Sequence, residues 1–303
     1  MSNIIHIKTI AQIHKALGLA SPLHPLVSLI KIDERVTTYD YGDATYVYDF
    51  YQIAFKSGIT GDITYGRNHY DYDQGSMVFT KPGQAQHYSN TSETEGEHGW
   101  VLLFHPDLIR RSGLASQMES YSFFSYDTNE ALHVSEREKN ILTDLVGQVE
   151  EEYCQNIDKH TQRLIVSNIE LILNYCTRYY ERQFLVRQNH NLDLMERVDA
   201  ILKHYFESEK VIENGLPTVK YLSEAMCMSS SYLSDMMKSA TGRNAQQYMQ
   251  DHLIERIKNA LLSTNEQVSQ IAYGLGFEYP QHLSKLFKAK TGMTPLEYRK
   301  SIN

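Results

Sequence analysis

The feature that most constrains the fold is an internal repeat in the last third of the 303-residue chain. Residues 219–228 match residues 268–277 at a shift of 49, and after one inserted residue the shift becomes 50. The matching pairs are Val219 and Val268, Leu222 and Ile271, Met226 and Leu275, Met228 and Phe277, Leu233 and Leu283, Ser234 and Ser284, Met237 and Phe287, Lys238 and Lys288, Thr241-Gly242 and Thr291-Gly292, and Tyr248 and Tyr298. The sequence therefore contains two copies of one supersecondary unit.

Each copy predicts a short helix, a tight turn and a second helix that ends at a glycine. The expected helices are 219–226 and 230–240 in the first copy, 268–275 and 280–290 in the second, and a longer helix over about 245–262 that joins the copies. Gly276 suits a turn with positive φ, and Pro280 suits the first turn of a helix. Gly242 and Gly292 suit the position just after a helix.

Two helices joined by such a turn form a helix-turn-helix, whose second helix can enter the major groove of DNA. The alternative is a helical repeat that makes only protein contacts. The second helices favour DNA because their outward positions are polar or basic, as contacts to phosphates and base edges require. These positions are Ser230, Ser231, Ser234 and Lys238 in the first copy and Gln281, His282, Lys285, Lys288 and Lys290 in the second.

Charge is distributed unevenly along the chain. Residues 1–215 carry 19 basic and 30 acidic side chains, whereas residues 216–303 carry 10 basic and 7 acidic ones. A polyanion would therefore bind the C-terminal part, although chance surface composition gives the same pattern. The net charge of −8 excludes a protein that coats nucleic acid with a basic surface over its whole length.

The second copy carries a longer motif. It begins with Val268-Ser269-Gln270-Ile271-Ala272-Tyr273-Gly274-Leu275-Gly276-Phe277 and continues with Leu283, Phe287-Lys288, Thr291-Gly292, Thr294-Pro295 and Tyr298-Arg299. With these residues, the stretch from about Leu192 to Lys300 resembles the DNA-binding domain of the AraC/XylS family of bacterial transcription regulators. The resemblance implies two helix-turn-helix units on one rigid seven-helix domain, which read adjacent major-groove faces about one helical turn apart. It also implies double-stranded DNA and RNA polymerase as partners.

Carried over by position, the resemblance assigns base-facing residues to both second helices. They are Ser231, Ser234 and Asp235 in the first copy and Pro280, Gln281, Ser284 and Lys285 in the second, and Arg256 matches a basic position in the connecting helix. With the outward polar residues added, the expected DNA-binding set is Ser230, Ser231, Ser234, Asp235, Lys238, Arg256, Pro280, Gln281, His282, Ser284, Lys285 and Lys288.

Two residues depart from the family pattern. Asp235 stands where the family usually has Arg, so it either accepts a hydrogen bond from a cytosine or serves only the helix surface. Cys227 stands where the second copy has Gly276. We interpret Cys227 as a small, half-buried residue that tolerates the turn, in preference to a redox-sensing thiol.

The first part of the chain has a β-type pattern. Residues from Val36 to about Trp100 are rich in Tyr, Val, Ile, Phe and Thr, interrupted by turn residues, which is typical of an antiparallel sandwich or barrel. The stretch Gly75-Ser76-Met77-Val78-Phe79-Thr80-Lys81-Pro82-Gly83, followed by His87, resembles the strand-turn-strand of the cupin-like barrel that many members of this family carry. The expected fold class is therefore α+β, with an N-terminal cupin-like β-barrel, helical connectors and a C-terminal all-α domain with two helix-turn-helix units.

Two amphipathic helices are expected after the β-rich part. One covers residues 135–154, where Ser135 and Glu138 form a capping box, and the other covers about 161–183. They either pack on the β-rich part as a hairpin or form a dimer interface, and we favour a homodimer. The expected domains are 1–130 for sensing, 131–190 as connector and dimerisation region, and 191–303 for DNA binding.

An aromatic set in the first part has two interpretations. Its rings and hydroxyls could bind a small effector, with carbohydrate or an aromatic compound suggested by the family, or Tyr could simply fill strand positions. The expected effector-binding residues are Tyr46, Tyr48, Tyr51, Tyr65, Tyr70, Tyr72, His87 and Trp100. His69 and His87 do not form the His-x-His pattern of metal-dependent cupins, so neither a metal nor another cofactor is expected.

Other classes of protein are disfavoured by what the sequence lacks. It has no apolar run of membrane-spanning length, no signal-peptide pattern and no paired cysteines, so we expect a cytoplasmic protein with no membrane partner. It also lacks the common nucleophile, phosphate-loop and zinc-protease motifs, so we do not expect an enzyme. Two functions remain: a regulator controlled by an effector, or a constitutive DNA-binding regulator whose first domain only dimerises or recruits a partner.

Overall fold

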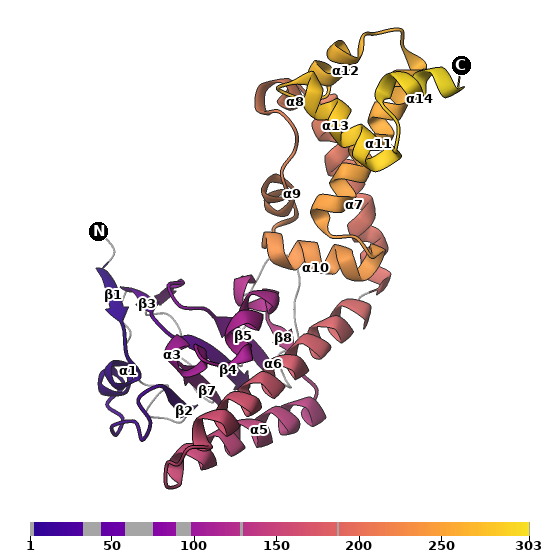
Figure 1. Ribbon diagram of the computed structural model, residues 1–303. Coiled ribbons are helices and arrows are strands. Elements are labelled where there is room, and N and C mark those ends of the chain that lie inside the picture. The colour runs from indigo at the N-terminus through magenta and orange to yellow at the C-terminus, as the bar shows by residue number, and fades with distance from the viewer. Residues whose placement is uncertain are drawn as a thin grey trace. The chain divides into compact units, whose positions relative to one another are not determined.

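The computed structural model describes residues 3–32, 44–57, 75–88, 98–127, 130–186 and 188–302 (Figure 1). The chain divides into two compact units, Met1–Gln183 and Phe184–Asn303. The first unit holds the described strands, and the second is helical. None of the described helices is long and apolar enough to cross a membrane.

The first unit contains two β-sheets. The smaller sheet has the order β1 (Asn3–Ile7), β3 (Ala44–Tyr48) and β6 (Ala85–Tyr88). The larger has the order β2 (Val27–Ile32), β7 (His98–Phe104), β4 (Tyr51–Ser57), β5 (Ser76–Thr80) and β8 (Leu132–His133). Strand β1 pairs in parallel with β3, and the other described pairs are antiparallel. The α+β class is confirmed, but the described strands form two sheets and not the expected closed barrel.

The two sheets share an apolar cluster. Side chains alternate between the faces of a strand, so Tyr46 and Tyr48 of β3 are both buried. They pack in one cluster with Ile30 of β2, Leu103 of β7 and helix α1 (Ile10–Ala16). This shared core makes the strands and α1 one packed body.

The helices that follow β7 cover this body. They are α3 (Pro106–Ile109), α4 (Gly113–Gln117), two short 3-10 turns (Met118–Ser120 and Ser122–Ser125), α5 (Glu136–Cys154) and α6 (Thr161–Val186). The Ser135 capping box is present at the start of α5. On α5, Thr143 accepts a hydrogen bond from Trp100 Nε1 at 3.1 Å. On α6, the Tyr180 hydroxyl donates to the Glu130 carbonyl at 3.0 Å. Both expected helices therefore pack on the β-rich part, and dimerisation through them stays a prediction.

The second unit is built from helices α7 (Gln188–Glu207), α8 (Lys210–Asn214), α9 (Val219–Met226), α10 (Ser230–Thr241), α11 (Ala245–Ser263), α12 (Val268–Gly274), α13 (Pro280–Thr291) and α14 (Pro295–Ile302) (Figure 1). The predicted helices of the repeat are confirmed, with ends that agree to within one residue. Helices α9 and α10 pack on α7, and α10 also packs on α11, while α12, α13 and α14 pack on α11. Helix α11 is thus the shared support of both copies.

Candidate nucleic-acid interface

The turns of the two copies have the same hydrogen bonds. In the first copy the Met228 N–H donates to the Ser223 carbonyl at 3.0 Å. In the second copy the Phe277 N–H donates to the Ala272 carbonyl, also at 3.0 Å. The repeat seen in the sequence is therefore a repeat of backbone geometry, and we call α9 with α10 the first helix-turn-helix unit and α12 with α13 the second.

The second helices of the two units also end in the same way. Gly242 and Gly292 adopt φ of 74° and 79°, in the left-handed region that favours glycine. The hydroxyls of Thr241 and Thr291 each donate to the carbonyl four residues earlier at 2.8 Å. This ending fixes the length of both helices and the start of the helix that follows each of them.

One buried face holds each second helix in place. Leu233 and Met237 of α10 are fully buried, and so are their repeat partners Leu283 and Phe287 of α13. Residues three or four apart share a helix face, so the opposite face of each helix is left outward. The repeat therefore presents two equivalent helices with equivalent outward faces.

Most of the predicted DNA-binding residues lie on these outward faces. Ser230, Lys238, Gln281, His282, Lys285 and Lys288 are exposed, and Ser231, Ser234, Asp235, Pro280, Ser284 and Arg256 are partly buried. Two of the serines already have partners, since Ser230 lies 2.8 Å from the Ser223 hydroxyl and Ser234 accepts from the Ala245 N–H at 3.3 Å. The accessible members of the set therefore include Lys238 of α10 and the basic and amide side chains of α13.

Arg256 is held differently from the other predicted contacts. Its guanidinium lies 4.8 Å from the ring centroid of Phe206 on α7, and Phe206 also stacks on His252. Its Nε is buried and has no hydrogen-bond partner among the described residues. Desolvation, with a smaller contribution from Arg256, lowers the pKa of His252. Arg256 thus packs α11 against α7, and its contact with DNA stays a prediction.

Cys227 is the only described residue other than glycine with positive φ, at 57°. It is exposed and not half-buried as expected. Its repeat partner Gly276 has φ of 84°, and a Cβ there would lie 2.7 Å from the Val211 carbonyl oxygen. The second turn therefore requires glycine for two reasons, conformation and close packing against α8, whereas the first turn tolerates a side chain.

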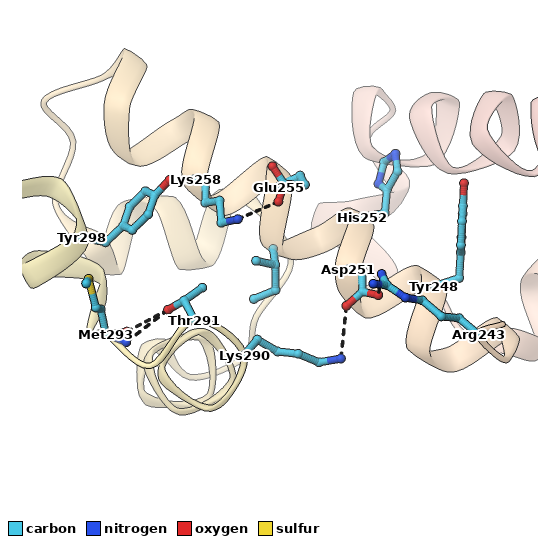
Figure 2. Close-up of a pocket in the computed structure, with 11 residues that line it drawn as sticks. Arg243, Tyr248, Asp251, His252, Glu255, Lys258, Lys290, Thr291, Met293 and Tyr298 are labelled. Atoms are coloured by element: carbon cyan, nitrogen blue, oxygen red, sulfur yellow. Dashed lines mark hydrogen bonds and ion pairs between the residues drawn. The ribbon is translucent and has the colours of Figure 1, made fainter. Parts of the chain in front are cut away.

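A groove of about 600 Å³ lies along α11 between the ends of α10 and α13 (Figure 2). On its wall, Asp251 of α11 forms ion pairs with Arg243, which follows α10, and with Lys290 of α13. Lys290 was predicted from the sequence as an outward residue, whereas Asp251 and Arg243 were not predicted. Their only signal was that these charges are not repeated between the copies, as Met293 and Ala240 stand opposite Arg243 and Lys290.

The predicted effector residues are distributed over the first unit in several environments. Tyr46 and Tyr48 are buried in the shared cluster, and Trp100 is buried beneath α5. Tyr51 is partly buried between Phe104 and Phe124, and desolvation raises its pKa. His87 lies in β6. Tyr65, Tyr70 and Tyr72 lie outside the described residues, as does His69. No group of three or more potential metal ligands occurs among the residues the structure describes.

Comparisons with known proteins find relatives over the helical unit and over longer parts of the chain. Residues 222–301 match the family model of a helix-turn-helix domain. YisR, an uncharacterised HTH-type transcriptional regulator of Bacillus subtilis strain 168, is 37% identical over 28% of this chain and 30% of its own length. The arabinose operon regulatory protein of Escherichia coli K12 is 23% identical over 74% of this chain and 72% of that protein.

Among solved structures, the C-terminal domain of the response regulator yesN from Fusobacterium nucleatum aligns with a TM-score of 0.31 and 30% identity. It covers 35% of this chain and 98% of that domain. The matches with YisR and with YobQ, another Bacillus subtilis regulator, span only about a third of those proteins. Through residues 222–301 the chain is therefore similar to helix-turn-helix transcriptional regulators of the AraC family.

Proposed function

We propose that the chain binds double-stranded DNA with sequence specificity through both helix-turn-helix units and thereby regulates transcription. The observation that carries the proposal is the equivalence of α10 and α13, which share one pattern of burial and leave polar faces outward. Two such helices on one domain suit two successive segments of the major groove. AraC-family proteins are transcription regulators and not enzymes, which agrees with the lack of catalytic motifs in the sequence.

The residues of α13 supply the clearest base contacts. A Gln side chain can pair with both N6 and N7 of adenine, and a Lys can donate to O6 or N7 of guanine, so Gln281 and Lys285 are assigned to base edges. Lys238 and Lys288, equivalent in the two copies, are assigned to phosphates. Asp235 keeps its two interpretations, a cytosine contact or a role in the helix surface alone.

The assignment of Lys285 is tested by binding of the full chain to duplexes selected from a random pool. Lys285→Ala or Gln281→Ala is expected to weaken binding to the selected sequence by about 1–3 kcal/mol and to leave binding to random DNA nearly unchanged. Lys203→Ala is the matched control, because Lys203 is an exposed lysine on α7. Equal discrimination by wild type and Lys285→Ala would contradict the base contact.

Dimerisation is proposed for the first unit. Leu164 and Leu171 of α6 are exposed, with 45% and 43% of their surface accessible, and lie seven residues apart on one face of the helix. A second copy of this chain would cover them and bring two DNA-binding domains to two half-sites. The double change Leu164→Glu with Leu171→Glu is expected to convert a dimer to a monomer in light scattering. A wild-type chain that is already monomeric at working concentration would contradict the homodimer.

The first unit is also proposed to sense a small effector. Its two sheets with a shared core are consistent with part of a cupin-like barrel, and Tyr51 is a partly buried member of the aromatic set among the described residues. In this proposal residues 1–130 sense, 131–190 connect and dimerise, and 191–303 bind DNA in the cytoplasm next to RNA polymerase. The alternative is a constitutive regulator whose first unit only dimerises or recruits a partner.

Thermal melting of the full chain with sugars and aromatic acids separates these alternatives. A ligand at a hundred times its Kd stabilises the folded state by about 2.7 kcal/mol, which raises the melting temperature of the first unit. Tyr51→Ala should abolish that rise, while Tyr279→Ala, an exposed tyrosine of the second unit, should leave it unchanged. A flat panel would favour the constitutive alternative.

A further inference from the structure

We propose that Asp251 is a positioning residue that couples the two helix-turn-helix units by holding Arg243 and Lys290 on one carboxylate. The coupling fixes the orientation of α10 relative to α13. Its consequence for DNA rests on the proposed function, but the coupling itself does not. The second helices of the two units, α10 and α13, which we call the recognition helices, therefore have a fixed relative orientation before DNA binds.

The geometry joins three separate elements at one side chain. Asp251 lies on α11, and its two carboxylate oxygens face in different directions along the groove (Figure 2). Oδ2 pairs with Nη1 of Arg243, two residues beyond the end of α10. Oδ1 accepts from Nζ of Lys290 at 3.2 Å, in the last turn of α13. The C-terminal ends of both recognition helices thus meet at one acid.

The environment favours these pairs over ordinary surface pairs. The Asp251 and Lys290 side chains are only 30% and 31% exposed, whereas Arg243 is 58% exposed. Partly buried charges are screened less by salt than charges on an open surface. A shared carboxylate also orders one side chain for two pairs, which lowers the conformational entropy lost per pair. Salt therefore screens the pair with Lys290 less than the pair with Arg243.

The repeat supplies an independent argument. The hydroxyls of Thr241 and Thr291 bond the same carbonyls in both loops, so the fold of each loop needs those residues. The charges do not follow the repeat, since Ser301 stands opposite Asp251 at the shift of 50. The fold of a single helix-turn-helix unit therefore does not require the ion pairs of Asp251 with Arg243 and Lys290. These ion pairs add a contact between the two helix-turn-helix units.

Packing on helix α11 does not by itself fix the orientation of α10 relative to α13. The first helix-turn-helix unit packs on α7 and on one part of α11. The second helix-turn-helix unit packs on α11, and its helix α12 also contacts α8. A bend or twist of α11 would move one recognition helix relative to the other. The protein loses less conformational freedom on binding two DNA sites when its two recognition helices already have the bound orientation. The coupling therefore raises affinity for a duplex with two sites and not for a duplex with one site.

The orientation is measured directly with spin labels on the free protein. Ala240→Cys and Ala289→Cys carry the labels at exposed positions near the ends of α10 and α13, in a full chain with Cys154→Ser and Cys227→Gly; Cys176 is buried and stays. Labelled protein is diluted with unlabelled protein so that only distances within one chain are read. Double electron-electron resonance should give one narrow distance distribution in the parent chain, which broadens or shifts in Asp251→Asn.

The matched control is Glu255→Gln, which removes an acid one turn further along α11. Glu255 pairs with Lys258 of the same helix at 2.7 Å and bridges no units. Its distance distribution should equal that of the parent chain. An unchanged distribution in Asp251→Asn would overturn the proposal, whether or not the chain binds DNA.

Binding to DNA gives the functional arm. Asp251→Asn should lower affinity about three- to ten-fold for a selected duplex with both sites and leave affinity for a duplex with one site scrambled unchanged. An equal loss on both duplexes would show a general defect and overturn the coupling. Failure of the parent chain to select any sequence would instead contradict the proposed function, and the distance measurement would still decide the role of Asp251.

Discussion

At the residue scale, the two turn positions show how one unit of structure accepts different side chains. Gly276 and Cys227 occupy equivalent turns with positive φ, but only Gly276 is pressed against the backbone of residues 211–215. The need for positive φ could be read from the repeat, because a glycine stood in one copy. The close approach of α8 could not, because it depends on a segment more than sixty residues away.

This difference predicts the effect of adding a methyl group. Gly276→Ala is expected to destabilise the helical unit by about 2–4 kcal/mol, because it combines an unfavourable φ with overlap on the Val211 carbonyl. Gly292→Ala, at φ of 79° with nothing within 4 Å of the added carbon, should cost about 1–2 kcal/mol. Denaturant unfolding followed by far-ultraviolet circular dichroism checks both, and equal costs would contradict the packing argument.

The aromatic residues of the first unit mark a limit of sequence reasoning at this scale. Tyr46, Tyr48 and Trp100 lie on strands, as β propensity predicts, and pack in the core. A tyrosine in a binding pocket and a tyrosine in a sheet core give the same alternating pattern. Only the positions of neighbouring strands and of α5 separate the two, and those depend on long-range pairing.

At the scale of elements, the helices were predictable because their signals are local. Caps such as Ser135 with Glu138, the periodic apolar positions and the terminal glycines all lie within one helix. The pairing of strands was not predictable in the same way. The parallel contact of β1 with β3 joins residues about forty positions apart, and no single strand carries a sign of it.

The docking of α5 on β2 predicts a change of stability with pH. Burial raises the pKa of Tyr153 to about 12, and its hydroxyl accepts a hydrogen bond from the Leu29 N–H. The unfolded value is about 10, so the folded state holds the proton more tightly. This contribution to stability is fully present below pH 10 and is lost as the pH rises towards 12.

The free energy of unfolding of the wild type should therefore fall more steeply above pH 10 than that of Tyr153→Phe. Urea unfolding at a series of alkaline pH values gives both slopes. Tyr279→Phe is the control, because Tyr279 is exposed, and its slope should match that of the wild type. Identical slopes for the wild type and Tyr153→Phe would contradict the role of the buried phenol.

At the scale of the whole molecule, the chain combines an acidic β-rich unit, with 15 basic and 24 acidic side chains, and a helical unit with 14 basic and 13 acidic ones. The sequence predicted the helices of the repeat, and its motif indicated a DNA-binding domain there, whereas the bounds of the three expected domains stay predictions. The coupling at Asp251 escaped prediction because it joins three elements that meet only in the folded unit. Sites made by one element are thus visible in a sequence, whereas contacts between elements are not.

The most direct test of the account is hydroxyl-radical footprinting of the full chain on a duplex selected from a random pool. Two recognition helices on one domain predict two protected patches for each bound DNA-binding domain, on one face of the duplex and about one helical turn apart. Lys285→Ala should weaken protection mainly in the patch bound by the second helix-turn-helix unit, because Lys285 lies on α13. A single protected patch for each bound domain, or uniform protection with no preferred sequence, would contradict the claim that both helix-turn-helix units bind DNA.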